Sequence, residues 1–203
     1  MIIGVCGNIG AGKSTIIEIL EKEAGYVPVY ETVEENPYLA DFYKDMKKWA
    51  FHSQLFFLIK RFDFLKRVDP LGGFILEDRT IDEDVEIFAR NLHEMGYISD
   101  KDWNTYIELF KTFSDHLPKP SGLIYLNASL ETLKEHVKRR GRTFENKISD
   151  DYLERLNALY SRWISNTTTP VLKIDCDSVD FVVSKKDRIE IIQKISKFAN
   201  SLS

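Results

Sequence analysis

The fold is decided by the first twenty residues, MIIGVCGNIGAGKSTIIEIL (residues 1–20). Residues 1–6 are a short apolar run, which predicts a buried strand, and the apolar-periodic stretch at residues 16–20 predicts a helix. Between them, residues 7–14 match the pattern G-x-x-x-x-G-K-[ST]. This order of strand, glycine-rich turn and helix predicts a loop that binds the phosphates of a nucleotide, because its N–H groups and the helix N-terminus attract an anion.

Two residues of this loop have specific expected roles. Lys13 is expected to reach the β- and γ-phosphates, and the Ser14 hydroxyl is expected to ligate Mg²⁺. The expected nucleotide-binding residues are Gly7, Asn8, Ile9, Gly10, Ala11, Gly12, Lys13, Ser14 and Thr15. The alternative is a chance glycine-rich turn, but the flanking strand and helix are the context that the motif requires.

Length and composition restrict the class of protein. A chain of 203 residues is long enough for one sizeable core and too short for two, so we expect a single domain over residues 1–203. The net charge of −4 argues against binding to nucleic acid or to a membrane surface, since both require a positive field. No apolar run approaches the ~20 residues of a membrane helix. The loop begins at Gly7, which leaves no room for a signal peptide, and the two cysteines read as free thiols. A cytoplasmic location is therefore expected.

Strands and helices alternate along the chain. Strands are expected at residues 1–6, 26–30, 74–76, 123–126 and 171–174, and helices after the first loop at residues 36–49, 51–68, 80–95, 100–117, 129–139, 150–164 and 188–198. This alternation predicts an α/β fold with a parallel sheet and helices on both faces. In such a sheet, ligands bind beyond the carboxyl ends of the strands.

Polar residues follow two of the predicted strands at this same edge. Glu31 follows the second strand and is a candidate general base for a substrate hydroxyl. After the third strand, Asp78 could hold Mg²⁺, and Arg79 could contact phosphate or orient Glu31. The alternatives are a solvated carboxylate at Glu31 and a surface ion pair of Asp78 with Arg79. Their position beside the phosphate loop favours the functional interpretation.

A basic segment follows the predicted helix at residues 129–139. Arg140 and Arg142 flank Gly141, and this arrangement is typical of a mobile lid, here at about residues 139–149, that closes over a triphosphate. The alternative is a solvated helix C-terminus, where basic residues are favourable in any case. The residues alone leave both interpretations open.

Two predicted helices carry polar residues on apolar faces. Asp84 lies within the apolar stripe of helix 80–95, where a carboxylate costs free energy unless it is paired or hydrogen-bonded; the alternative is a favourable charge in the first turn. Glu83 is explained as the capping-box partner of Thr80. On helix 51–68, one stripe holds Gln54, Phe57, Leu58 and Arg61, which could recognise a nucleobase or could simply be packing.

Together, these motifs resemble the deoxynucleoside kinase family, especially its bacterial deoxyadenosine and deoxyguanosine kinases. The similar residues extend over nearly the whole chain: the loop at 7–14, Glu31, residues 35–39, residues 42–45, Trp49, Gln54, Arg61, residues 78–80, Asp84, Phe88-Ala89, residues 140–142 and Glu145. The chain departs from the family pattern at Thr32, where a proline is frequent, and at Phe144, where the lid often has a second acidic residue.

The resemblance implies a P-loop kinase fold with a five-stranded parallel sheet, a short arginine-rich lid, and a homodimer with a helical interface. It implies that Glu31 deprotonates the deoxyribose 5′-hydroxyl beside Arg79, with Lys13 as the third catalytic residue. The implied substrate-binding residues at the sugar are Glu31, Tyr43 and Glu145. Gln54 would hydrogen-bond the base edge, Arg61 and Asp84 would form a pair that reads the exocyclic groups of the base, and Phe88 is a further substrate-binding residue. Arg140 and Arg142 would close on ATP, and Ser14 and Asp78 would hold Mg²⁺.

The leading hypothesis is therefore an ATP-dependent kinase that phosphorylates the 5′-hydroxyl of a deoxynucleoside. Deoxyadenosine is favoured because an ionised carboxylate such as Asp84 only accepts hydrogen bonds, and the adenine amino group donates them. Deoxyguanosine and deoxycytidine also carry amino groups and stay open. A nucleoside-monophosphate kinase, or another small-molecule kinase on the same scaffold, is a further hypothesis. A GTP-binding switch is less favoured, because residues 146–149 (NKIS) lack the aspartate of the guanine-binding N-K-x-D pattern.

Overall fold

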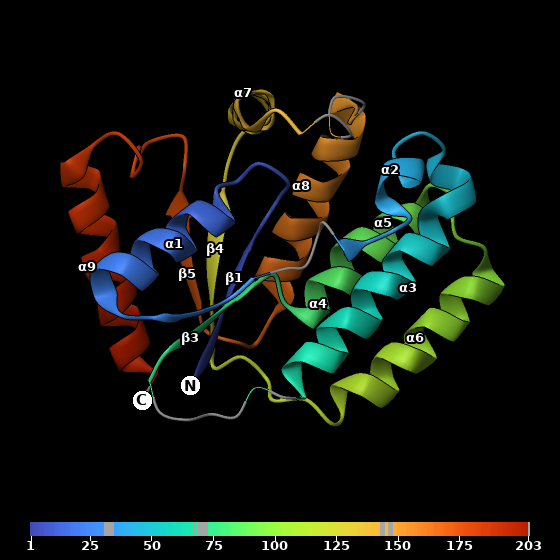
Figure 1. The fold of residues 1–203 in the computed structure, drawn as a ribbon, viewed down its shortest axis with the longest axis horizontal. Helices are drawn as coiled ribbons and strands as arrows, with labels where there is room; N and C mark the ends of the chain where they lie inside the picture. The colour runs from blue at the N-terminus through green and yellow to red at the C-terminus, as the bar shows by residue number, and fades with distance from the viewer. Residues whose placement is uncertain (31–34, 67, 69–72, 143–144, 146–147, 203) are drawn as a thin grey trace.

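The computed structural model describes residues 1–30, 35–66, 68, 73–142, 145 and 148–202. Five parallel strands form one sheet in the order β2-β3-β1-β4-β5. The strands are β1 (Ile2–Gly7), β2 (Val27–Val29), β3 (Ile75–Asp78), β4 (Gly122–Asn127) and β5 (Val171–Asp175). Helices cover both faces of the sheet (Figure 1), so the predicted α/β fold with a five-stranded parallel sheet is confirmed.

The central strand β1 positions the phosphate loop. All six of its residues are buried, as expected for a strand that is covered on both faces. Val5 pairs with Asp78 of β3 on one side and with Ile124 of β4 on the other. Because the chain leaves β1 toward β2 on one side and β4 lies on the other, the loop that follows Gly7 occupies the place where ligands bind in open α/β sheets.

The helices are α1 (Lys13–Ala24), α2 (Leu39–Phe42), α3 (Met46–Leu65), α4 (Ile81–Glu83), the π-helical η2 (Asp84–Ala89), α5 (Arg90–Glu94), α6 (Asp100–Ser114), α7 (Leu130–Arg140), α8 (Asp150–Asn166) and α9 (Lys185–Ser201). In Figure 1, α1 and α9 lie on one side of the sheet, and α8 and α4 lie on the other, with α3 and α6 further out. Within the described ranges, none of these helices is both long and apolar enough to span a membrane.

Two differences from the predicted helices concern the region of the cavity. The predicted break near residue 50 lies instead before Met46, because the Asp45 side chain accepts a hydrogen bond from the Lys48 N–H at 3.1 Å and caps α3. Ala50 is consequently buried inside one long helix. The predicted helix 80–95 begins at its expected capping box but contains the π-helical turn η2. Such turns are rare and are frequently found at functional sites.

Candidate active site

A cavity of about 500 Å³ contains most of the predicted site residues. Its lining includes Ile9, Lys13, Ser14, Tyr43, Gln54, Phe57, Asp78, Arg79, Asp84, Phe88, Arg140, Arg142 and Glu145. These residues come from the phosphate loop, the end of β3 and several helices, so the fold gathers side chains that are far apart in the sequence. Arg61 is not part of this lining and lies behind Asp84. Glu31, the expected general base, lies outside the described residues.

The phosphate loop has a well-defined shape around Lys13. The buried Lys13 Nζ donates hydrogen bonds to the carbonyl oxygens of Gly7 at 2.9 Å and Asn8 at 3.0 Å. Gly12, the residue before α1, has a φ of 95°, which residues with a side chain rarely adopt. The loop therefore curls around its own lysine and leads directly into the N-terminus of a helix, as an anion-binding loop requires.

The loop is also fixed from outside by α7 and α8. A Cβ atom added at Gly10 would lie 2.8 Å from the Leu133 carbonyl oxygen, so only glycine fits against α7. The Asn8 side chain donates to the Leu153 carbonyl oxygen of α8 at 2.9 Å. Of the other predicted loop residues, Ala11 is buried in the core and Thr15 is exposed. The loop geometry is thus set by the packing of two helices that come later in the chain.

Ser14 and Asp78 form the predicted metal-binding pair. The Ser14 hydroxyl donates to Asp78 Oδ2 at 2.7 Å, while the buried Asp78 Oδ1 has no hydrogen-bond partner in the described part of the chain. No group of three or more His, Cys, Asp or Glu side chains among the described residues is arranged to hold a metal ion. A hydroxyl with one unpartnered carboxylate oxygen fits Mg²⁺, which takes few protein oxygens and completes its shell with water and phosphate.

Arg79 has an unusual backbone beside this pair. Its φ is 72°, the one positive φ among the described non-glycine residues. Its N–H donates to the Val5 carbonyl oxygen at 3.1 Å, and its carbonyl oxygen accepts a hydrogen bond from Arg61 Nη1. The Arg79 guanidinium carbon lies 3.9 Å from the centre of the Phe88 ring. Such backbone conformations cost about 1–3 kcal/mol, persist where the surroundings fix them, and cluster at active sites.

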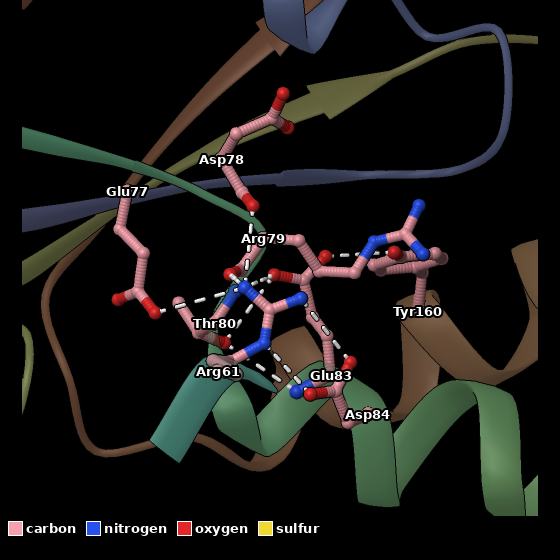
Figure 2. A network of polar contacts seen from close by, with 8 residues as sticks. All are labelled: Arg61, Glu77, Asp78, Arg79, Thr80, Glu83, Asp84 and Tyr160. Carbon is pink, nitrogen blue, oxygen red and sulfur yellow. Dashed lines mark hydrogen bonds and ion pairs between the residues drawn. The ribbon is translucent and has the colours of Figure 1, made fainter. Parts of the chain in front are cut away.

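Arg61 is the centre of a buried polar network (Figure 2). Its Nε donates to Asp84 Oδ2 at 2.7 Å and its Nη2 to Asp84 Oδ1 at 3.3 Å, so the pair is bidentate. On the other side of the guanidinium, Nη1 lies 3.9 Å from Glu77 Oε1. The side chains of Arg61, Asp84 and Glu77 are all less than 10% exposed. Asp84 is thus a paired, buried carboxylate, which explains how it occupies the apolar stripe of its helix.

Sequence reasoning missed Glu77. Burial raises the pKa of the Glu77 carboxyl to about 8, against the opposing positive charge of Arg61, and the neighbouring carboxylates Glu83, Asp84 and Asp82 raise it further. The signal was present, because Glu77 directly follows the apolar run Phe74-Ile75-Leu76. The burial cost that drew attention to Asp84 applies equally to a carboxylate at the end of a buried strand.

The predicted sugar-binding and lid residues lie together at another part of the cavity. Glu145 is buried, and its carboxylate accepts from Arg140 Nη2 at 2.6 Å; Arg142 Nη1 lies 3.6 Å from the same group. Tyr43 lines the same cavity, and burial raises the pKa of its hydroxyl. Tyr152 of α8 also lines the cavity. The sequence did not indicate it, because its helical spacing is the same as that of the core residues of this helix.

The chain matches a known protein family over nearly its whole length. The model of the deoxynucleoside kinase family matches residues 3–200 of the chain. The chain belongs to the deoxynucleoside kinase family. The family that its motifs resemble is therefore confirmed, and this deoxynucleoside kinase is a phosphotransferase with the P-loop kinase fold.

Individual relatives of this kinase cover nearly its whole length. A deoxyadenosine/deoxycytidine kinase from Bacillus subtilis is 37% identical over 198 residues, which are 96% of this chain and 91% of the relative. A deoxyguanosine kinase from the same organism is 36% identical and covers 91% of each chain. A deoxyadenosine kinase from M. mycoides, solved with bound dATP, is 33% identical with a TM-score of 0.84 and covers 97% of this chain and 99% of that one. The names of these relatives include three different bases.

Proposed function

We propose that this kinase transfers the γ-phosphoryl group of ATP to the 5′-hydroxyl of a deoxynucleoside, with deoxyadenosine as the preferred acceptor. One observation carries the proposal: a single cavity is lined both by the phosphate loop and by buried polar side chains suited to a nucleobase. Phosphoryl transfer depends on holding donor and acceptor in line and neutralising charge, and a shared cavity does both. The M. mycoides relative, solved with dATP and with dCTP, supports a deoxynucleotide or deoxynucleoside as ligand.

The donor phosphates would lie in the loop at residues 7–15. Its N–H groups and Lys13 would bind the phosphate oxygens, and Arg140 and Arg142 would add positive charge from the other side of the cavity. Ser14 and Asp78 would hold Mg²⁺, which neutralises charge on the β- and γ-phosphates when it is bound.

The acceptor sugar would lie between the loop and Glu145. Glu31 would accept the proton of the 5′-hydroxyl, with Arg79 close to the reacting oxygens. Tyr43 and Glu145, which line the same cavity, would hydrogen-bond the 3′-hydroxyl. This arrangement would bind a deoxynucleoside through both of its hydroxyl groups.

The base would lie against Gln54, Asp84 and Phe88, which line the cavity. Asp84 accepts two N–H groups from Arg61, and the guanidinium stabilises its negative charge. An ionised carboxylate accepts a hydrogen bond from the adenine amino group, and the Gln54 amide can both donate and accept. Arg61 would therefore act by holding Asp84. Deoxyguanosine and deoxycytidine are the next candidates, since both also carry an amino group.

The test is a rate measurement of phosphate transfer from ATP to the four natural deoxynucleosides, with ribonucleosides and nucleoside monophosphates as controls. We expect the highest kcat/KM for deoxyadenosine and negligible transfer to monophosphates. A monophosphate that outcompetes every nucleoside would contradict the proposal and indicate a nucleoside-monophosphate kinase.

Replacing the proposed base is the sharpest variant. Glu31→Gln is expected to lower kcat by ~10² or more while ATP binding persists, because loss of a general base affects the chemical step. Steady-state kinetics and calorimetric ATP binding check both parts. Glu34→Gln, three residues further on, is the matched control; equal rates for the two variants would reject the role of Glu31.

We also propose that two copies of the chain associate through α3 and α6. These helices pack together, with Phe62 stacked on Phe113 at a ring-centre distance of 4.2 Å, and they lie at the outer side of the molecule (Figure 1). Ile59 and Phe64 of α3 are 47% and 43% exposed. Light scattering should give the mass of a dimer, and Ile59→Glu should give a monomer, whereas Val183→Glu, at another exposed apolar residue, should not. A monomeric wild type would contradict this assembly.

A further inference from the structure

Glu83 makes more contacts than a helix start requires. Its side chain is fully buried, and Oε2 accepts the Thr80 N–H at 2.7 Å, which completes the capping box of α4. Oε1 has no part in this cap, yet it accepts the Gly7 N–H at 3.3 Å and the Tyr160 hydroxyl at 2.7 Å. Figure 2 shows Glu83 between Thr80 and Tyr160. One carboxylate therefore joins the end of β1, the start of α4 and the middle of α8.

The contact with Gly7 fixes the start of the phosphate loop. Gly7 is the last residue of β1, and an added Cβ atom would lie 2.7 Å from the Leu126 carbonyl oxygen of β4. The backbone here is therefore confined by β4 on one side and held by Glu83 on the other. Because the Gly7 N–H is bonded to Glu83, this N–H is used for positioning the loop within the protein.

The contact with Thr80 fixes the backbone that follows Arg79. Arg79 has a positive φ of 72°, and its own N–H is held by the Val5 carbonyl oxygen. Glu83 holds the next N–H along the chain. A conformation of this kind persists only when its surroundings determine it, and the bond to Glu83 is one of these determinants.

The charge of Glu83 is also placed between the two halves of the site. Burial raises the pKa of the Glu83 carboxyl, while the positive charges of Arg79 and Lys13 act in the opposite direction. The carboxylate thus interacts with one cation of the phosphate loop and with one cation of the β3 end. Hydrogen bonds and charge both connect the same two segments.

We propose that Glu83 is a positioning residue for phosphoryl transfer, which fixes the start of the phosphate loop relative to Arg79. It acts through the N–H groups of Gly7 and Thr80 and does not itself contact the reacting atoms. This inference rests on the proposed kinase function and adds a residue to it. A shift of 1 Å in the relative position of reacting groups can cost about 10²-fold in rate, so such a link matters for turnover.

Glu83→Gln tests the link with almost no change in shape. An amide has one oxygen and one NH₂ group, so it can accept from the Gly7 side or from the Thr80 side but not from both. In either orientation of the amide, its NH₂ group faces another donor, the N–H of Gly7 or of Thr80. We expect kcat to fall at least about tenfold. The dissociation constant for ATP should fall as well, because loss of a negative charge beside Lys13 and Arg79 strengthens their attraction for a triphosphate.

This combination separates positioning from simple destabilisation, since a partly unfolded sample would lose rate without tighter ATP binding. Two variants serve as controls. Glu86→Gln makes the same chemical change at a residue of η2 whose side chain is 40% exposed, and Ser99→Ala removes the N-cap of α6 away from the cavity. Both should keep kcat within about twofold of the wild type, because surface pairs and remote caps affect only stability.

The outcomes distinguish this inference from the proposed function. Transfer by the wild type, with kcat of Glu83→Gln equal to that of Glu86→Gln, would overturn the positioning role alone. No transfer by the wild type to any deoxynucleoside would overturn both. If Glu83→Gln does not fold, hydrogen exchange of the wild type decides: the Gly7 and Thr80 amide protons should exchange slowly with and without ATP, and fast exchange at either one would overturn the proposal.

Discussion

The phosphate loop and the Arg61 network are two solutions to the same problem of holding charge in a folded chain. The loop places one lysine against carbonyl oxygens five and six residues away in the sequence. The Arg61 network joins α3 to residues 16 to 23 positions later, in β3 and η2. The loop is therefore a local structure with a sequence pattern, whereas the network exists only after three elements have packed.

This difference has an energetic consequence. Lys13 donates charge-assisted hydrogen bonds to two neutral carbonyl groups, and its charge also acts on Glu83. Its loss would leave Glu83 with its hydrogen bonds to Gly7, Thr80 and Tyr160. Arg61 lies between two buried carboxyl groups. Since the pKa of Glu77 is raised to about 8, the loss of Arg61 would leave mainly the Asp84 carboxylate without its cation. We therefore expect the network to determine stability and base preference, and the loop to determine rate.

The largest effect is expected when the network loses its centre. Arg61→Met should lower the free energy of unfolding by about 3–5 kcal/mol, because the Asp84 carboxylate stays buried without a partner charge. Urea denaturation measures this change. The control is Arg90→Met, whose partner Glu86 is 40% exposed, and it should cost less than about 1 kcal/mol. Similar losses for the two variants would remove the distinction between network and surface pair.

Removing the lysine of the loop should affect the rate strongly and the stability little. Lys13→Met is expected to lower kcat by about 10²–10³, since a fixed positive charge at the transferred phosphate is lost, with much less effect on unfolding than Arg61→Met. Steady-state kinetics and denaturation of the same sample give both numbers. Lys22→Met, on the exposed face of α1, is the control. A Lys13 variant that is as unstable as Arg61→Met but still active would refute the comparison.

The smallest effect concerns selectivity. Asp84→Asn is expected to change the ratio of kcat/KM between deoxyadenosine and thymidine by about tenfold, because the base site loses an acceptor-only group. The measurement is a competition between the two nucleosides at limiting ATP. Asp82→Asn changes a carboxylate outside the cavity lining and should keep the wild-type ratio. An unchanged ratio for Asp84→Asn would show that the base is recognised elsewhere.

The phosphate loop could be predicted from the sequence, and the Arg61 network only in part. The loop at residues 7–14 and the sheet followed from a motif and from the alternation of apolar runs. Asp84 could be singled out because a carboxylate interrupts an apolar stripe, and Gln54 and Arg61 because they share one stripe. The pairing of Arg61 with Asp84 is implied by the family resemblance. The residue pattern alone predicts neither this pair nor the contact with Glu77, since periodicity places a residue on a face and does not identify what packs against that face.

Two features depended on geometry that a sequence pattern does not encode. Glu83 satisfies a capping box, and this local explanation hid its second oxygen, which bonds the first residue of the phosphate loop 76 positions earlier. The boundary at Asp45 was missed because an aspartate cap competes with the apolar pattern that runs through Ala50. In both cases a simple local pattern, the capping box at Glu83 and the apolar run at Ala50, already explained the sequence.

The π-helical turn of η2 determines which changes of chain length this region can accept. Thr80 is fixed at one end by its cap, and Leu92 is fixed at the other end in the core. Deleting one residue between them would convert the turn to regular α-helix and keep nearly the same rotation between the two ends, because a π-helical turn holds about one residue more than an α-helical turn. Inserting a residue would instead turn the ends by about 100° relative to each other, and either the cap beside Arg79 or the buried leucine would lose its place.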